Sequence, residues 1–316
     1  MSAGWVAGGV RAQAMSRRRL GEQGARDLAA TADLPTAVDR LVTSPYGHDV
    51  RRGMDLRAAQ HAVTRTYLWN LRVLAGWLPR PGVELVRLLA GWAELANLER
   101  LVAGMRAGTG VAPANDPMQP YALGALSTVW PRAASVADRA ALREVLAASP
   151  WGDPGPGDDR AVVQVLRLTW AARVATGVPA ARTWARSAAA LLVAHDLAVG
   201  HPGDGGRPSR PVQRATARVL GAAAARATSL DDLRAGLDRS CAASLGDADD
   251  VAGLWRCEIA WWRGVRRDAL ALTAARLGPE PVVGQIAALA ADAWLTRAAL
   301  EVTARAEPAE VLDDLL

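Results

Sequence analysis

Adjacent pairs of acidic residues are the first groups in this sequence that could do chemistry. They include Asp158-Asp159, Asp231-Asp232 and Asp249-Asp250. Acid–base catalysis by two carboxylates requires both groups to reach one reacting centre, whereas neighbouring residues of a helix point in different directions. Acidic residues are also favoured in the first turn of a helix, where the helix dipole stabilises them. We therefore predict that these pairs are solvated helix starts.

Nucleophile and nucleotide-binding motifs give no stronger signal. Ser44 and Ser149 lie in turns without the His-Asp partner pattern that activates a serine, although His48 follows Ser44 by four residues. The glycine-rich stretches at 4–9 and 203–206 are not followed by the Lys-Ser/Thr of a P-loop. The sequence therefore predicts no catalytic residue, no nucleotide site and no bound cofactor.

Metal and disulfide chemistry also lack a framework. The chain has two cysteines, Cys241 and Cys257, and four scattered histidines at positions 48, 61, 195 and 201. Two cysteines in 316 residues do not make a disulfide scaffold, and the histidines do not add a zinc-binding spacing. We expect buried free thiols and no metal site.

The positive charge of the chain is carried by arginine alone. Lys and Arg total 37 and no Lys is present, which gives a net charge of +5 and a pI near 10.1. Arginine binds carboxylates and phosphates in a bidentate manner, so the bias suits an acidic partner, an anionic lipid or nucleic acid. A GC-rich genome that encodes Arg in place of Lys explains the same bias. The weak interface candidates are Arg51, Arg52, Arg266 and Arg267, for which an ordinary solvated face is the alternative.

The most apolar stretches, 188–194 and 286–291, are far shorter than the ~20 residues that span a bilayer. The N-terminal segment lacks the basic region that opens a signal peptide, because its arginines follow the apolar stretch. We expect a cytoplasmic protein that reaches a membrane through a partner or through its surface.

Ala and Leu dominate the chain and alternating strand patterns are missing, so the sequence predicts an all-α fold. Breakers at Ser44–Gly47, Pro79–Gly82, Gly108–Pro120 and Gly200–Pro211 separate the expected helices. These are expected near 1–30, from Asp33, and at 55–78, 83–106, 121–148 with an interruption at Pro131, 160–176, 180–199, 212–226, 230–244, 249–276 and 280–305.

An internal repeat is the most informative pattern. Ser44-Pro45-Tyr46-Gly47 resembles Ser149-Pro150-Trp151-Gly152 at an offset of 105 residues, and Ser244-Leu245-Gly246 is a weaker third copy. A capped helix is predicted before each turn, with a capping box at Ser135–Asp138 and at Ser229–Asp232 and with Asp33 as the first cap. We therefore predict three pseudo-repeated helical bundles, at 1–110, 111–205 and 206–316, arranged as a funnel around a central hollow.

The same residues resemble the C subunit of bacterial and archaeal V-type (V/A-type) ATPases, which is homologous to the eukaryotic d subunit. The resemblance covers about residues 1–300. Residues 184–199 lack the Asn-Leu pair of the family's closing helix, and the third turn lacks its Pro-aromatic pair. The stretches that carry the resemblance are Trp5…Arg11…Met15…Leu20, Leu41…Ser44-Pro45-Tyr46-Gly47, and Trp92-Ala93-Glu94-Leu95-Ala96-Asn97-Leu98 with Gly104 and Arg106.

The resemblance implies a non-catalytic central-stalk subunit at the cytoplasmic face of the plasma membrane. Its implied partners are the rotor-ring proteolipid subunits and the central shaft subunits, and it would couple H⁺ or Na⁺ transport to ATP hydrolysis or synthesis. A stand-alone helical scaffold or adaptor remains an alternative, because the repeats support it equally. An Arg-rich nucleic-acid binder is less favoured, since the arginines are dispersed and no compact basic recognition helix is evident.

Overall fold

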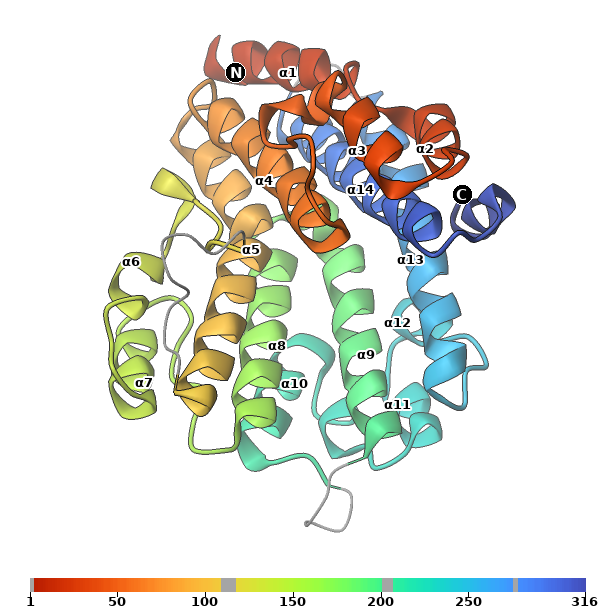
Figure 1. Ribbon diagram of the computed structural model, residues 1–316. Coiled ribbons are helices and arrows are strands. Elements are labelled where there is room, and N and C mark those ends of the chain that lie inside the picture. Colours follow the sequence, from red (N-terminus) through yellow and green to blue (C-terminus); the bar gives the residue numbers. More distant parts are fainter. Residues whose placement is uncertain (1–2, 109–117, 201–206, 275–277) are drawn as a thin grey trace. The chain divides into compact units, whose positions relative to one another are not determined.

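The protein is helical throughout the part that a computed structural model describes, residues 3–108, 118–200, 207–274 and 278–316 (Figure 1). No strand occurs in these ranges, which confirms the all-α prediction, and none of their helices has the length and apolarity needed to cross a bilayer. Parts of two predicted loops, 109–117 and 201–206, lie outside the described residues. The elements are α1 (Ala3–Ser16), α2 (Gly21–Ala29), α3 (Leu34–Val42), η1 (Pro45–His48), α4 (Leu56–Ala75), α5 (Arg80–Ala107), η2 (Gly124–Leu126), α6 (Trp130–Ala133), α7 (Arg139–Ala147), α8 (Asp159–Gly177), η3 (Pro179–Ala181), α9 (Arg182–Val199), α10 (Arg210–Leu220), η4 (Ala224–Arg226), α11 (Leu230–Gly236), α12 (Arg239–Ala243), α13 (Val251–Thr273), α14 (Pro279–Ala304) and η5 (Ala309–Leu315).

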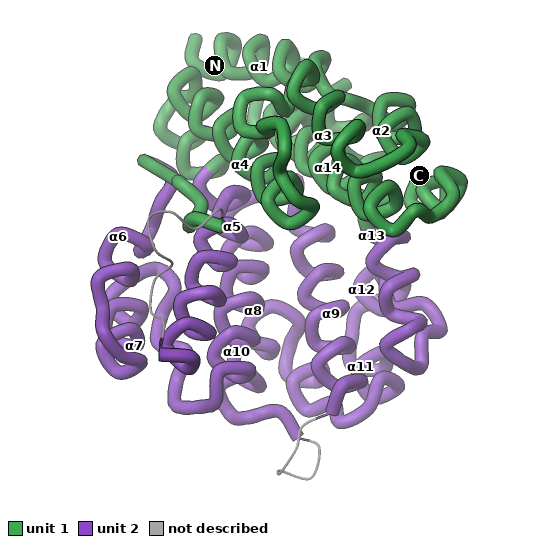
Figure 2. The backbone as a smooth tube through the Cα atoms, viewed as in Figure 1, with its two compact units in different colours: residues 1–86, 113–125, 262–316 green, residues 87–112, 126–261 purple. Residues whose placement is uncertain are grey.

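The chain divides into two compact units (Figure 2). Unit 1 contains residues 1–86, 113–125 and 262–316, and unit 2 contains residues 87–112 and 126–261. The second and third predicted turns both fall in unit 2, so this division does not decide whether the chain forms three bundles. That arrangement stays a prediction.

Helix α14 forms the centre of unit 1. It packs against α1, α2, α3 and α4, and buried residues occur on all its sides, from Val282 to Thr303. A helix that is apolar all round must be surrounded by other elements to exclude water. The other helices of unit 1 therefore pack around α14.

Two apolar clusters fill unit 2, and α8 contributes to both. Leu168 and Ala171 of α8 belong to the cluster formed with α9, α10, α11 and α12. Leu166 of α8 belongs to a second cluster with α5, α7 and the fully buried ring of Trp151. Helix α8 therefore holds α5 and α9 on its two sides.

Carboxylate and hydroxyl caps begin many of the helices. Asp33, Asp138 and Asp158 accept a backbone N–H three residues ahead at the starts of α3, α7 and α8. Ser229 caps α11 as predicted, and the Asp232 carboxylate accepts from Thr228. The capping box predicted at Ser135–Asp138 is wrong, because the helix begins after Asp138 and Asp138 itself is the cap.

The acidic pairs lie where solvated helix starts were predicted. Asp158 caps α8, and Asp231 and Asp232 occupy the first turn of α11. Asp250 accepts the N–H of Gly253 just as α13 begins.

The three turns share a serine contact. The hydroxyls of Ser44, Ser149 and Ser244 each donate to the backbone carbonyl three residues earlier, at 2.7, 2.7 and 2.6 Å. The first two serines also accept the backbone N–H of the aromatic residue, in both cases at 3.1 Å. Both aromatic side chains, Tyr46 and Trp151, are buried. The two Ser-Pro-aromatic-Gly turns therefore share their serine contacts and a buried ring, but they differ at the glycine, because Gly152 has φ +72° and Gly47 lies in the short helix η1.

A buried carboxylate holds the second turn. Glu94 of α5 is fully buried, and its Oε2 accepts the indole N–H of Trp151 at 2.9 Å. Its Oε1 accepts the hydroxyl of Ser127 and the backbone N–H groups of residues 128, 129 and 130 at 2.7 to 2.8 Å. Burial raises the pKa of Glu94, but these hydrogen bonds together lower it by more than burial raises it. The pKa of Glu94 therefore lies below its ordinary value.

Asp292 of α14 holds the first turn in the same manner. Its Oδ2 accepts the hydroxyl of Tyr46 at 2.7 Å and the N–H of Leu20 at 3.1 Å, and its Oδ1 accepts the N–H of Gly21 at 2.7 Å. Burial, followed by the charge of Asp292, raises the pKa of Tyr46 well above its ordinary value. Each acid thus joins a buried aromatic ring to the N-terminus of a short helix.

A third buried acid keeps the same register. Glu94, Asp196 and Asp292 each lie 19 residues after the last residue of the preceding α-helix. These intervals run from 75 at the end of α4 to 94, from 177 at the end of α8 to 196, and from 273 at the end of α13 to 292. All three are largely inaccessible, with exposed fractions of 0%, 7% and 6%. The helix pairs α4–α5, α8–α9 and α13–α14 therefore share the spacing of a buried carboxylate from the end of the first helix, although the helices themselves differ in length.

Candidate functional site

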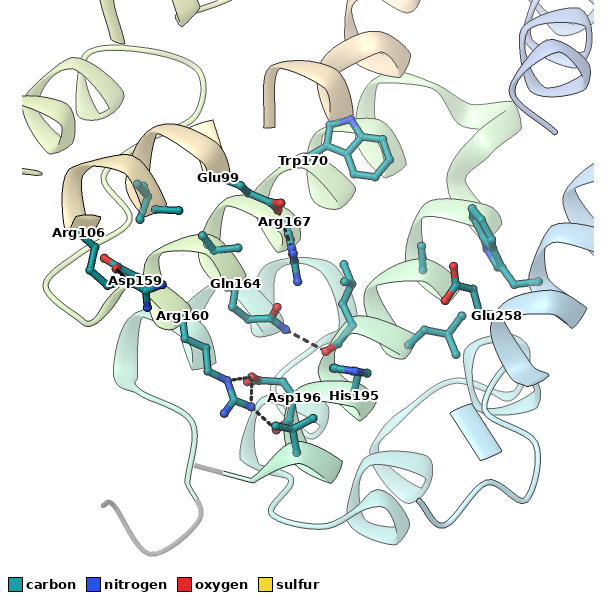
Figure 3. Close-up of a pocket in the computed structure, with 18 residues that line it drawn as sticks. Glu99, Arg106, Asp159, Arg160, Gln164, Arg167, Trp170, His195, Asp196 and Glu258 are labelled. Carbon is teal, nitrogen blue, oxygen red and sulfur yellow. Dashed lines mark hydrogen bonds and ion pairs between the residues drawn. The ribbon is translucent and has the colours of Figure 1, made fainter. Parts of the chain in front are cut away.

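A groove of about 710 Å³ lies among α5, α8, α9 and α13 within unit 2 (Figure 3). The contributing residues of α5, α8 and α9 are three or four positions apart, so each helix turns one face toward the groove. The lining residues are Glu99, Val102, Ala103 and Arg106 of α5, Asp159, Arg160, Val163, Gln164, Arg167 and Trp170 of α8, Ala188, Leu191, Leu192, His195, Asp196 and Val199 of α9, and Glu258 and Trp261 of α13.

Ion pairs tie α8 to both of its neighbours across the groove. Arg167 donates to Glu99 of α5 at 2.7 Å. Arg160 reaches Asp196 of α9 at 2.8 to 2.9 Å through two of its nitrogens. Charge-assisted contacts that are partly shielded from water bind more strongly than surface pairs do. The groove therefore has a rigid polar floor rather than a set of mobile charges.

Indole rings brace the same helices. The Trp170 N–H donates to the carbonyl of Leu88 at 2.9 Å, and the Trp261 N–H donates to the carbonyl of Trp184 at 3.0 Å. Gln164 donates to the carbonyl of Leu192 at 3.1 Å. Backbone positions on either side of α8 and α9 are thereby fixed, so the groove is set by the helices and not by loops.

His195 and Glu258 remain exposed at the side of the groove away from Arg106 (Figure 3). Val199 is exposed at the end of α9, with 54% of its surface accessible. Apolar surface beside available charged groups is typical of a site that receives a protein segment.

The groove offers carboxylates, guanidinium groups and one imidazole, but its lining contains no Ser, Thr, Cys, Tyr or Lys. A nucleophile and an adjacent base are the usual requirement for covalent catalysis. Elsewhere in the described residues, no group of three His, Cys, Asp or Glu is placed to hold a metal ion.

The two cysteines are free thiols, as predicted. Cys241 is buried in the apolar cluster of unit 2, and burial raises its pKa to about 11. Cys257 is half-buried, and its thiol donates to the carbonyl of Leu245. Neither has the low pKa of a reactive cysteine.

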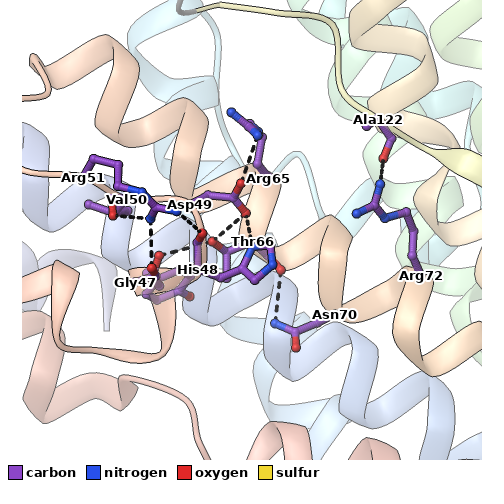
Figure 4. A network of polar contacts seen from close by, with 11 residues as sticks. Gly47, His48, Asp49, Val50, Arg51, Arg65, Thr66, Asn70, Arg72 and Ala122 are labelled. Atoms are coloured by element: carbon purple, nitrogen blue, oxygen red, sulfur yellow. Dashed lines mark hydrogen bonds and ion pairs between the residues drawn. The ribbon is translucent and has the colours of Figure 1, made fainter.

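The predicted interface arginines lie in unit 1. Arg51 donates to the carbonyls of Gly47, His48 and Val50, and so completes the end of the first turn (Figure 4). Arg52 pairs with Asp39 across the same turn. Their contacts are structural, and the prediction that they meet a partner is not tested by them.

Arg266 and Arg267 lie together on α13 and line a separate pocket of unit 1. Arg266 pairs with Glu22 and donates to the carbonyls of Leu315 and Leu316. Burial and the neighbouring Arg19 lower the pKa of Arg266. Arg267 is exposed, and its side chain pairs with the adjacent Asp268.

Sequence reasoning did not single out the groove residues. Residues 160, 163, 164 and 167, and residues 188, 191, 192 and 195, have the spacing of a helix face, and this was the available signal. The spacing shows that these residues share a face. It does not show which other helix that face meets.

Comparison with known proteins identified no relative: no family model matches the chain, and no curated protein matches it.

Proposed function

We propose that this chain is a non-catalytic subunit of a V/A-type rotary ATPase that joins the central shaft to the membrane rotor ring. The single observation that carries the proposal is the threefold recurrence of a buried carboxylate at one register, in α5, α9 and α14. Three similar helix pairs are what a funnel of three related bundles requires. The Ser-Pro-aromatic-Gly turns that resemble the family are also the turns that Glu94 and Asp292 hold.

The mechanical role requires stiffness. A subunit that transmits torque must not deform when the shaft turns, and buried, fully hydrogen-bonded polar networks make a core rigid. Glu94 accepts five hydrogen bonds and Asp292 accepts three from distant parts of the chain. Such networks resist the sliding of one helix past another.

The groove of unit 2 supplies a place for a shaft segment. It combines apolar side chains with charges of both signs, so a helix end can dock there by apolar burial and by ion pairs. In this proposal, charged side chains of the shaft meet Glu258 and His195, and interlocking side chains prevent slip.

The proposal is tested by affinity capture of the tagged chain from detergent-solubilised membranes of the cells that encode it. We expect recovery of a rotor-ring proteolipid together with shaft and nucleotide-binding ATPase subunits. Recovery of the chain alone, or with unrelated soluble proteins, would refute the assignment and leave the helical adaptor as the better account.

A charge-reversal pair tests the groove. Glu258→Arg places a positive charge in the groove at an exposed position, and Glu310→Arg makes the same change on the exposed η5 segment. We expect capture of the shaft subunit to fall at least tenfold with Glu258→Arg and to be unchanged with Glu310→Arg, while the ring proteolipid is retained by both.

A further inference from the structure

A second concave site, within unit 1, gathers positive charge that its surroundings do not balance. The pocket has a volume of about 330 Å³ and is lined by residues of α1, the connection between α1 and α2, η1, α4 and α14. Arg11, Arg18 and Arg19 line it, and within the described residues none of the three is paired with a carboxylate. Three arginines therefore line one small space, and none of the contacts described for them is with a carboxylate: Arg19 donates its Nε to the carbonyl of Ser16.

Other arginines of the chain pair with carboxylates. Arg143, Arg160 and Arg167, for example, each contact a carboxylate within 3.0 Å. The buried Nε of Arg11 has no hydrogen-bond partner in the described structure, and the Arg11 guanidinium lies 6.0 Å from the ring centroid of Trp77, at the edge of the lining. An unsatisfied buried donor is unfavourable unless something binds it.

Among the described residues that line the pocket, Asp292 is the one acidic side chain, and its hydrogen-bonding capacity is already used elsewhere. Asp292 is buried, and its two oxygens already accept from Leu20, Gly21 and Tyr46. Its charge is stabilised by these donors on the α14 side. With three guanidinium groups and one carboxylate, the lining keeps an excess of positive charge.

Aromatic rings form another wall of the same pocket. The His48 imidazole stacks on Trp69, with ring centroids 4.2 Å apart. The Nδ1 of His48 is held by Asp49 at 2.7 Å, and Asp49 is in turn bonded by Thr66 and Arg65 (Figure 4). The rings are therefore fixed in place and offer flat surface beside the charged groups.

We infer that this pocket binds a phosphate ester. Guanidinium groups match the oxygens of a phosphoryl group in bidentate fashion, and three of them suit its double charge. The volume exceeds that of phosphate alone, which leaves space for the attached organic group against the rings. The phosphoryl group comes from a soluble ester or from the headgroup of an anionic lipid, and this inference does not depend on the proposed role in an ATPase.

The site is tested by calorimetric titration of the full chain with glycerol 3-phosphate and with pyrophosphate, at constant ionic strength and with glycerol as the neutral control. Arg18→Gln removes a lining charge. Arg17→Gln is the matched control, because Arg17 is the adjacent exposed arginine and does not line this pocket. We expect Arg18→Gln to weaken binding at least tenfold and Arg17→Gln to change it less than twofold.

A second arm uses vesicles of neutral phosphatidylcholine with and without phosphatidic acid. If the soluble esters bind, and Arg18→Gln reduces this binding while Arg17→Gln does not, the ligand of the pocket is a soluble small molecule. Co-sedimentation with phosphatidic acid vesicles, reduced by Arg18→Gln alone and without binding of the soluble esters, assigns a lipid headgroup. The inference is overturned by the absence of binding in both arms, or by equal losses in the Arg17 and Arg18 variants, which would indicate general surface charge.

Discussion

Replacement of Glu94 by Gln removes one negative charge from the buried network of unit 2 and leaves the shape of the side chain almost unchanged. The remaining amide oxygen can accept from only one side of the network. If it stays with Ser127 and the N–H groups of residues 128 to 130, the new amide N–H₂ faces the indole N–H of Trp151, which is also a donor. One buried donor therefore loses its acceptor.

The expected cost follows from these contacts. A buried donor without a partner costs ~1–3 kcal/mol, and hydrogen bonds to a charged group contribute ~1.5–3 kcal/mol, compared with ~0.5–1.5 kcal/mol for neutral ones. The loss is reduced because no charge has to be buried in the variant. We expect Glu94→Gln to lower the free energy of unfolding by about 3 kcal/mol at pH 7.

The cost should depend on pH. The pKa of Glu94 is lowered in the folded protein, so the ionised carboxylate stabilises the fold above the pKa of the unfolded chain, about 4.3. This stabilisation is lost as the pH falls from there through the folded pKa. The difference between wild type and Glu94→Gln should therefore be constant near neutral pH and shrink in acid.

Urea denaturation followed by circular dichroism, at several pH values from 7 to 3, measures both quantities. Glu99→Gln is the matched control, because Glu99 lies on the same helix and pairs with Arg167 at the groove with partial exposure. It should cost less than about 1 kcal/mol. The reasoning fails if the two variants cost the same, or if the effect of Glu94→Gln does not change between pH 7 and pH 3.

Three further predictions concern the turns and the thiols. Tyr46→Phe removes the hydroxyl bonded to the buried acid of α14 and should cost about 1.5–3 kcal/mol in urea denaturation. Gly47→Ala should cost about 3 kcal/mol or more, because its methyl group would overlap a backbone carbonyl oxygen, whereas Gly152→Ala, in open space at φ +72°, should cost only about 1–2 kcal/mol; comparable urea midpoints would contradict this difference. Labelling with a disulfide reagent at pH 8 should modify half-buried Cys257 first and Cys241 only at the rate of unfolding, since burial raises the pKa of Cys241 to about 11.

The long helices could be predicted from the sequence because their signals are local. The expected helices at 55–78, 83–106 and 180–199 correspond to α4, α5 and α9 within a few residues. Their apolar periodicity spans several turns, and Pro or Gly marks their ends. Fold class and most long elements therefore followed from short-range patterns.

The breaks that were missed have a long-range cause. A single helix was expected over residues 1–30, but the chain turns between Ser16 and Gly21, where Asp292 accepts the N–H groups of Leu20 and Gly21. The run expected at 121–148 was predicted to be interrupted at Pro131, but Pro131 lies in the first turn of α6, and Glu94 accepts the N–H groups at the start of that helix. An acid that begins a helix from far along the chain leaves no mark in the local sequence.

The candidate sites could be predicted from the sequence only in part. Asp292 is the only acidic residue between Ile286 and Leu300, and a lone acid in such an apolar helix was a signal for a buried polar contact. Pairings such as Arg167 with Glu99 depend on which helix faces meet. The partners across the groove were therefore not predictable from one sequence.

The third carboxylate explains why the family resemblance weakens in the middle of the chain. α9 ends at Val199, three residues after Asp196, whereas α5 continues from Glu94 to Ala107. The positions equivalent to Asn97 and Leu98 are thus Val199 and Gly200, where the helix stops.

The carboxylate of Asp196 has a different kind of hydrogen-bond donor. Arg160 binds its carboxylate and also donates to the backbone carbonyls of Asp196 and Gly200, at 2.9 and 2.6 Å. A guanidinium group is suited to this place, because the last carbonyls of a helix lack N–H partners and the helix dipole is negative there. In a repeat that keeps the buried acid but loses the helix beyond it, an arginine would replace the backbone N–H groups that donate to Glu94 and Asp292. The missing Asn-Leu pair is therefore consistent with a diverged middle copy, and it does not count against the threefold arrangement that we propose.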